Sequence, residues 1–227
     1  MRALRMFGSS VGTKVVLAFT GLSLFGFLLV HLYGNLLAFL GPATYNEHAH
    51  ALISNPLIIP AELGLLALFL MHAYKAVANY LSNRGARPEG YGMKKWAGGP
   101  SRKSVGSSTM IWTGLATLLF VAIHLKTFKY GPYYVSASAM PGAPEERDLY
   151  RLFVEVFQHP VMVVAYVISM TLLGLHLRHG ITSSMQSLGI IPESNTGAVL
   201  RTGLVLAVVI AGLFAILPVI VFFGLVR

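Results

Sequence analysis

Five apolar stretches constrain the fold of this chain more than any other feature of its sequence. A helix that spans a bilayer needs about 20 predominantly apolar residues, because the hydrocarbon core offers no partners for free backbone groups. The stretches cover residues 15–40, 57–81, 109–128, 161–183 and 200–223. The sequence therefore predicts an all-α integral membrane protein with five transmembrane helices, organised as a single domain over residues 1–227.

The composition supports this class and removes several kinds of chemistry. Of the 227 residues, 55% are hydrophobic and only 11% are charged, and the mean hydropathy is +0.68. A chain without cysteine forms no disulfide, binds no iron–sulfur cluster through thiolates and attaches no haem covalently. The basic, then apolar, N-terminus is similar to a signal peptide. Its apolar run is too long and lacks an A-x-A cleavage pattern, so we expect a retained first helix.

The positive charges are distributed unequally between the two ends of the predicted helices. With the N-terminus inside, the inner segments hold most of the 17 lysines and arginines, many of them between residues 82 and 108. The positive-inside rule then predicts a cytoplasmic N-terminus and an outer C-terminus. This asymmetry also accounts for the net charge of +9, so we do not expect nucleic-acid binding.

Four of the eight histidines lie near the ends of the first four apolar stretches, one in each, and the ends alternate. At a rise of ~1.5 Å per residue, the first and third lie about 25 Å from the inner ends of their helices, whereas the second and fourth lie beside inner basic residues. Antiparallel helices would therefore group them at two levels, roughly 15–20 Å apart. The outer level has His31 and His124, and the inner level has His72 and His176.

This grouping of histidines favours two haems held between helices. A single intramembrane histidine is commonly a packing residue, but ionisable groups are costly in a bilayer and face the bundle interior. Di-iron bundles need inward carboxylates, and Glu62 is the sole acid within the predicted spans. Two imidazoles on one haem leave the iron no open position, so such a haem transfers electrons. The sequence thus predicts a haem-binding four-helix bundle made by the first four spans.

Four segments, taken in order, resemble the cytochrome b subunit of succinate:quinone oxidoreductases, in its single-chain, five-helix, two-haem branch. They are LVHLYGN, LFLMHAYKAV, VAIHLKT and LHLRHGITSSMQSLG. The resemblance implies that His31 and His124 are axial ligands of an outer haem b, and that His72 and His176 are axial ligands of an inner haem b.

The same resemblance implies the partners and the reaction. A flavoprotein subunit would oxidise succinate on the cytoplasmic side, and an iron–sulfur subunit would relay electrons through the inner and then the outer haem to menaquinone. The reverse direction is fumarate reduction, and this chain would hold no dicarboxylate site. The implied location is the cytoplasmic membrane of a bacterium, where the basic inner face would dock the hydrophilic subunits. A higher oligomer of the three-subunit complex is compatible with this assignment.

The fourth segment offers two histidines as ligands. In the family the axial histidine precedes a glycine by four residues, which matches His176 and Gly180. We therefore assign His179 to a haem propionate or to a partner subunit. Some fumarate reductases of the family carry a glutamate where this chain has Gly174, so a proton route through that position is in doubt.

Further residues are candidates for quinone and propionate contacts. Glu62, about one turn inside the outer end of its helix, is the candidate for quinone protonation, although an interfacial carboxylate without that role has the same pattern. His50 is a candidate neighbour of the quinone, with His48 and His159 as alternatives on the same face. Cationic and hydroxyl groups pair with propionates. The candidates are Lys14, Arg178, Ser9 and Ser10 for the inner haem and Lys126 for the outer haem, although topology alone also explains these charges.

Two alternative functions and two local features complete the predictions. The alternatives are the cytochrome b anchor of a hydrogenase or formate dehydrogenase, and a haem-free transporter that relays protons through histidines. Helical spacing of charged and apolar residues predicts a short amphipathic helix within residues 145–157. We identify no internal repeat in the sequence.

Overall fold

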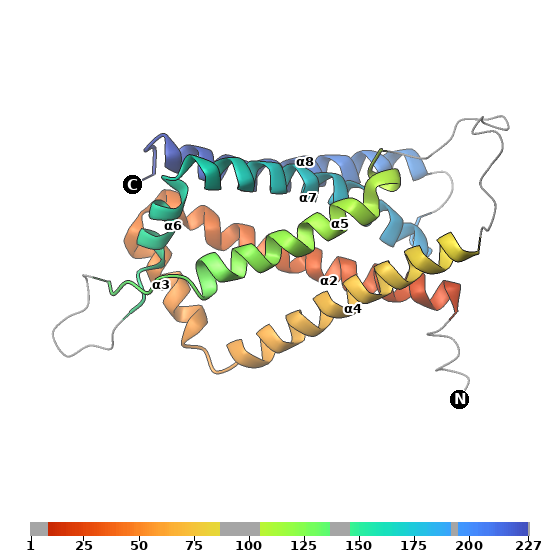
Figure 1. Ribbon diagram of the computed structural model, residues 1–227, viewed down its shortest axis with the longest axis horizontal. Coiled ribbons are helices and arrows are strands. Elements are labelled where there is room, and N and C mark those ends of the chain that lie inside the picture. Colours follow the sequence, from red (N-terminus) through yellow and green to blue (C-terminus); the bar gives the residue numbers. More distant parts are fainter. Residues whose placement is uncertain (1–8, 87–104, 137–145, 192–194, 227) are drawn as a thin grey trace.

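The computed structural model describes residues 9–86, 105–136, 146–191 and 195–226, and the long helices dominate it (Figure 1). These are α2 (Ser10–Leu36), α4 (Ile58–Gly85), α5 (Val105–His124), α7 (Pro160–Ser187) and α8 (Thr196–Phe222). All five spans are long and apolar enough to cross a membrane, which confirms the predicted all-α, multi-pass membrane protein. Two spans end in irregular turns, namely the 3₁₀ turn η1 (Leu37–Leu40) and the π turn η2 (Leu125–Lys129).

Four of the long helices form a ring and the fifth lies outside it. Going round the ring, α2 contacts α4, α4 contacts α5, α5 contacts α7, and α7 contacts α2. Helix α8 packs mainly along α7, and the two run side by side in Figure 1. Within the ring, α2 therefore faces α5 across the centre, and α4 faces α7. This diagonal relation decides which side chains meet.

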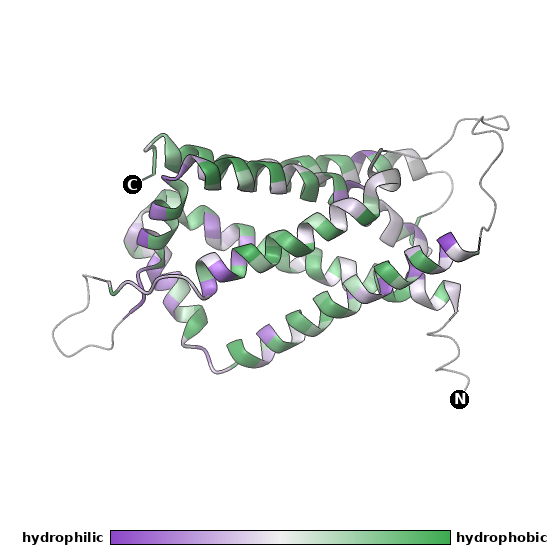
Figure 2. Cartoon of the chain, in the orientation of Figure 1, coloured by the Kyte–Doolittle hydropathy of each residue, from purple (hydrophilic) through white to green (hydrophobic). Residues whose placement is uncertain are grey.

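The long helices are hydrophobic along most of their length (Figure 2), and many of their large apolar side chains are exposed. Helix α4 is the extreme case, because none of its residues is buried. Its Leu63, Leu66 and Leu70 are each more than half exposed. Contiguous apolar surface of this extent is stable against lipid and not against water.

Two short helices cover the same end of the bundle. Helix α6 (Leu149–Phe157) fulfils the amphipathic prediction, since it buries Tyr150, Leu152, Phe153 and Phe157. Helix α3 (Pro42–Ile53) lies between the first two predicted spans, where the sequence predicted no helix. It was missed because residues 42–53 lack a clear apolar periodicity. The helix starts at Pro42, which is pre-organised for the first helical position, directly after Gly41 turns the chain at φ 98°.

The ring is built from two similar halves, a repeat that our sequence analysis did not identify. Each half consists of a long helix, an irregular turn, a short helix and a second long helix: α2, η1, α3 and α4, then α5, η2, α6 and α7. In both halves the first helix contains Thr-Gly-Leu, at Thr20 and Thr113. The same interval, about three helical turns, separates these threonines from His31 and His124.

Candidate functional site

The inner pair of predicted histidines meets across the ring. His72 comes from α4 and His176 from α7, and their ring centroids are 6.3 Å apart with the planes at 75°. Because α4 and α7 are diagonal neighbours, the two imidazoles point towards each other across the centre of the ring. The structure therefore brings these two residues together as the depth argument grouped them.

Threonine hydroxyls from the adjacent helices contact Nδ1 of both imidazoles in the inner pair. Thr20 Oγ1 lies 3.0 Å from Nδ1 of His72 and donates its own proton to the carbonyl oxygen of Val16 at 2.8 Å. A hydroxyl has one proton, so it accepts a hydrogen bond from the Nδ1–H group of His72. In the tautomer with the proton on Nδ1, Nε2 of His72 keeps its lone pair.

The other half of the ring repeats this arrangement. Thr113 Oγ1 lies 3.4 Å from Nδ1 of His176 and donates to the carbonyl oxygen of Met110 at 3.1 Å. The glycine after each threonine makes room for the imidazole. A Cβ on Gly21 would lie 3.2 Å from Cε1 of His72, and a Cβ on Gly114 would lie 3.3 Å from Cε1 of His176.

The outer pair also meets across the ring, but its neighbours differ. The ring centroids of His31 on α2 and His124 on α5 are 5.7 Å apart, with the planes at 89°. Nδ1 of His124 lies 3.2 Å from the hydroxyl oxygen of Tyr166. Asn35 Nδ2 donates to the carbonyl oxygen of His31 at 2.8 Å and lies 3.4 Å from Nε2 of the same residue. Since an amide nitrogen is only a donor, the Asn35 amide lies where it can donate to Nε2 of His31.

The remaining predicted residues lie apart from the two imidazole pairs. At the outer end, Glu62 forms an ion pair with Lys129, and His50 Nε2 lies 3.7 Å from Glu146. His48 packs against Gly34 and the ring of Tyr33. At the opposite end, His179 is half-buried on α7, and Ser9 caps α2 by accepting from the backbone of Gly12. The side chains of Ser10, Lys14 and Arg178 are exposed there.

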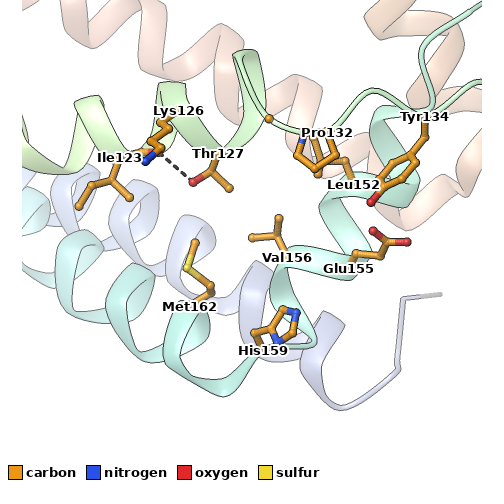
Figure 3. Close-up of a pocket in the computed structure, with 11 residues that line it drawn as sticks. Ile123, Lys126, Thr127, Pro132, Tyr134, Leu152, Glu155, Val156, His159 and Met162 are labelled. Carbon is orange, nitrogen blue, oxygen red and sulfur yellow. Dashed lines mark hydrogen bonds between the residues drawn. The ribbon is translucent and has the colours of Figure 1, made fainter.

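A cavity of about 540 Å³ opens at the end of the bundle that carries α3 and α6, between the end of α5, α6 and the start of α7. In Figure 3, Lys126 and Thr127 of η2 lie above it, whereas Val156, His159 and Met162 face it from below. The sequence analysis predicted Lys126 and His159 separately, but their common cavity depends on tertiary packing. Ile123, which also lines it, directly precedes His124.

One wall of this cavity carries an ionised network. Glu155 Oε1 accepts a hydrogen bond from Arg151 Nε at 3.0 Å. Hydrogen bonds from Tyr134 and then Arg151 hold the pKa of the Glu155 carboxyl below its ordinary value. The carboxylate is thus already satisfied, which leaves Lys126 and His159 as the donors available to a molecule in the cavity.

The described part of the chain offers imidazole pairs and no larger cluster of metal ligands. In the described part of the chain, no three His, Asp or Glu side chains gather as a site for a bare metal ion. No family model matches the chain, and the searches of curated proteins and of solved structures also give no significant match. Function must therefore be argued from the imidazole pairs and their surroundings.

Several residues that contact the imidazoles were not predicted from the sequence, among them Thr20, Thr113 and Tyr166. Thr20 and Thr113 were detectable, because the repeated Thr-Gly-Leu with a histidine three turns later places both functions on one helix face. Tyr166 was not, because nothing in its local sequence shows that it faces His124 on another helix.

Proposed function

We propose that this chain is the dihaem cytochrome b anchor of a succinate:quinone oxidoreductase, a subunit of succinate dehydrogenase or of quinol:fumarate reductase. The observation that carries the proposal is the arrangement of four imidazoles as two facing pairs across the ring. The segment resemblance supports the same assignment. A haem with two imidazole ligands supplies one-electron transfer, since it has no open coordination position.

The residues of both pairs fit a haem iron as axial ligands. A metal–imidazole bond is about 2 Å long, so two rings on opposite sides of one metal have centroids roughly 6 Å apart. The measured separations are 6.3 Å at the inner pair and 5.7 Å at the outer pair. Metal-binding histidines usually donate their second ring nitrogen to a neighbour, as His72 and His176 do to threonine. We assign His72 and His176 to the inner haem b, and His31 and His124 to the outer haem b.

Menaquinone would react at the outer end, where protons are also required. Counted back from the inner histidine of its own helix, Glu62 occupies in α4 the place that Tyr166 occupies in α7. This equivalent position supports Glu62 as the candidate for proton transfer, and Lys129 forms an ion pair with its carboxylate. His50, which precedes Glu62 in the chain, is a second candidate. The α5–α6–α7 cavity is the other candidate quinone site, since Lys126 and His159 are donors beside apolar walls.

The proposed partners are a flavoprotein and an iron–sulfur subunit on the cytoplasmic side of a bacterial membrane. The positive-inside argument supports a cytoplasmic N-terminus and an outer C-terminus. Residues 87–104, which carry much of the predicted basic docking face, lie outside the described residues. At the same end of the bundle, Lys14 and Arg178 are available to propionates or to the docked subunits, and His179 is a further candidate.

The proposal is tested by purifying the intact complex and assaying succinate-to-menaquinone electron transfer, with redox titration of its haems. We expect two low-spin haems b, flavin that co-purifies, and succinate oxidation. Haem together with hydrogenase or formate dehydrogenase activity would indicate the alternative anchor. A complex without low-spin haem absorbance would refute the proposal and favour the haem-free transporter.

Within this assay, two sets of variants separate the candidate quinone sites. Glu62→Gln addresses the α4 side, and the double variant Lys126→Ala with His159→Ala addresses the cavity. The set that raises the KM for the quinone while both haem spectra stay unchanged identifies the site.

A further inference from the structure

We infer that Tyr166 is a positioning residue for the outer imidazole pair, which orients His124 and lowers the reduction potential of the haem bound there. The inference rests on the proposed function, because it assumes that Nε2 of His124 binds haem iron. Its carrying observation is a buried phenol whose hydroxyl oxygen lies 3.2 Å from Nδ1 of His124. No sequence motif or comparison points to this residue.

The two levels of the ring differ at this contact. At the inner level, the two halves supply equivalent partners, since Thr20 and Thr113 follow the same pattern in α2 and α5. At the outer level, His124 has a tyrosine from α7 as its partner, whereas His31 has the amide of Asn35 from its own helix. The two histidines of the outer pair therefore have different partners. The contact of His124 with Tyr166, at 3.2 Å, is shorter than the contact of His31 with Asn35, at 3.4 Å.

Aromatic rings hold the phenol in place. Tyr166 is 6% exposed, and its ring packs edge-on against Phe157 at 4.9 Å and Phe120 at 5.0 Å between centroids. Phe128 lies edge-on at 6.2 Å and also contacts His124. Edge-to-face packing of this kind restricts ring rotation. The hydroxyl therefore has a fixed position relative to the imidazole.

The direction of the effect follows from the protonation state of the ligand. When Nε2 of His124 binds a metal, Nδ1 carries the proton and donates it to the oxygen of Tyr166. This hydrogen bond increases electron density on the imidazole and strengthens it as a donor. A stronger donor stabilises the oxidised iron more than the reduced iron, so the reduction potential falls.

The test is a redox titration of the purified complex with Tyr166→Phe, which removes the hydroxyl and keeps the ring. We expect both haems to remain, the potential of the outer haem to rise, and the inner potential to stay unchanged. The electron paramagnetic resonance signal of the outer haem should also change, because the imidazole is free to rotate. The matched control is Thr113→Val, which should alter the inner haem alone.

Each other outcome also decides the question. Selective loss of the outer haem from the phenylalanine variant would support a positioning role, since the inner haem then reports an intact fold. An unchanged outer potential and signal, equal shifts at both haems, or loss of both haems would overturn the inference. A wild-type complex that lacks haem would instead refute the proposed function.

Discussion

At the residue scale, each of the four intramembrane histidines has a polar side chain beside one of its ring nitrogens, although the partners differ. The hydroxyls of Thr20 and Thr113 contact Nδ1 of the inner imidazoles, and each hydroxyl also donates a hydrogen bond to a backbone carbonyl oxygen of its own helix. A donor from Asn35 faces Nε2 of His31. In a bilayer, where unpaired polar groups are costly, such partners keep an imidazole neutral and oriented.

If the inner imidazole pair binds haem as proposed, removing the threonine hydroxyls should weaken that binding. We expect Thr20→Val and Thr113→Val each to lower the haem affinity of the inner site by about 10–100-fold, because the second ring nitrogen loses its acceptor. Thr→Ser at the same positions keeps the hydroxyl and serves as the control. Haem occupancy of purified protein, resolved by optical redox titration, measures the effect. Equal loss in the valine and serine variants would show that the hydroxyl has no role.

The lowered pKa of Glu155, in the short helix α6, predicts that the stability of the fold depends on pH. Hydrogen bonds from Tyr134 and Arg151 stabilise its carboxylate in the folded state, so this contribution is fully present above the ordinary pKa of 4.5. It is lost as the pH falls below that value and through the lowered folded pKa. We expect a small decrease of Tm on acidification that is weaker in Glu155→Gln. Thermal unfolding across this range measures it, and identical pH profiles for the two proteins would contradict it.

At the scale of the elements, the short helices α3 and α6 are joined by one buried amide. Asn46 donates from Nδ2 to Asp148 Oδ1 at 2.8 Å and accepts from the backbone nitrogen of Tyr150 at 2.9 Å. Asp148 also caps α6 by accepting from the backbone nitrogen of Arg151. These hydrogen bonds of Asn46 and Asp148, called here the clasp, connect α3 of the first half to α6 of the second half.

Removing the side-chain amide of Asn46 should therefore destabilise the packing of α3 against α6. Asn46→Ala leaves the buried backbone N–H group of Tyr150 without this acceptor, and we expect a cost of about 1–3 kcal/mol. Glu47→Ala, at the exposed neighbouring position, is the control and should leave the stability nearly unchanged. Tm in detergent compares the two variants. The clasp would have no energetic importance if both behaved alike.

The close approach of α5 to the inner pair yields a second prediction at this scale. A Cβ at Gly114 would lie 3.3 Å from Cε1 of His176, so Gly114→Ala must displace the imidazole by a few tenths of an ångström. We expect an altered spectrum of the inner haem with the outer haem unchanged. Gly64→Ala, where the added Cβ has no neighbour within 4 Å, is the matched control. The same change in both variants would exclude a specific steric effect.

How far the sequence predicts these elements depends on the signal that each one leaves. The spanning helices were predictable because lipid demands long apolar runs, and α6 was predictable from its amphipathic spacing. Helix α3 was not predictable in this way, because its buried residue is the polar Asn46 and its sequence has no apolar periodicity. Likewise, the depth of each histidine was readable from helix rise, whereas the contact between Tyr166 and His124 required the packing of α5 against α7.

At the scale of the whole molecule, two similar halves place four histidines at two levels. Each half contributes one histidine to the inner level and one to the outer level, so each facing pair joins the two halves. The diagonal relation of α2 to α5 and of α4 to α7 brings about this pairing. If each pair holds one haem, the molecule contains two electron-transfer centres stacked along the bundle axis.

The central claim is that each haem belongs to one facing pair, and single histidine substitutions with redox titration of both haems test it most directly. We predict that His31→Ala and His124→Ala remove the same spectral component, and that His72→Ala and His176→Ala remove the other. Loss of one shared component from His31→Ala and His72→Ala would contradict the account, as would the absence of haem from the unsubstituted complex.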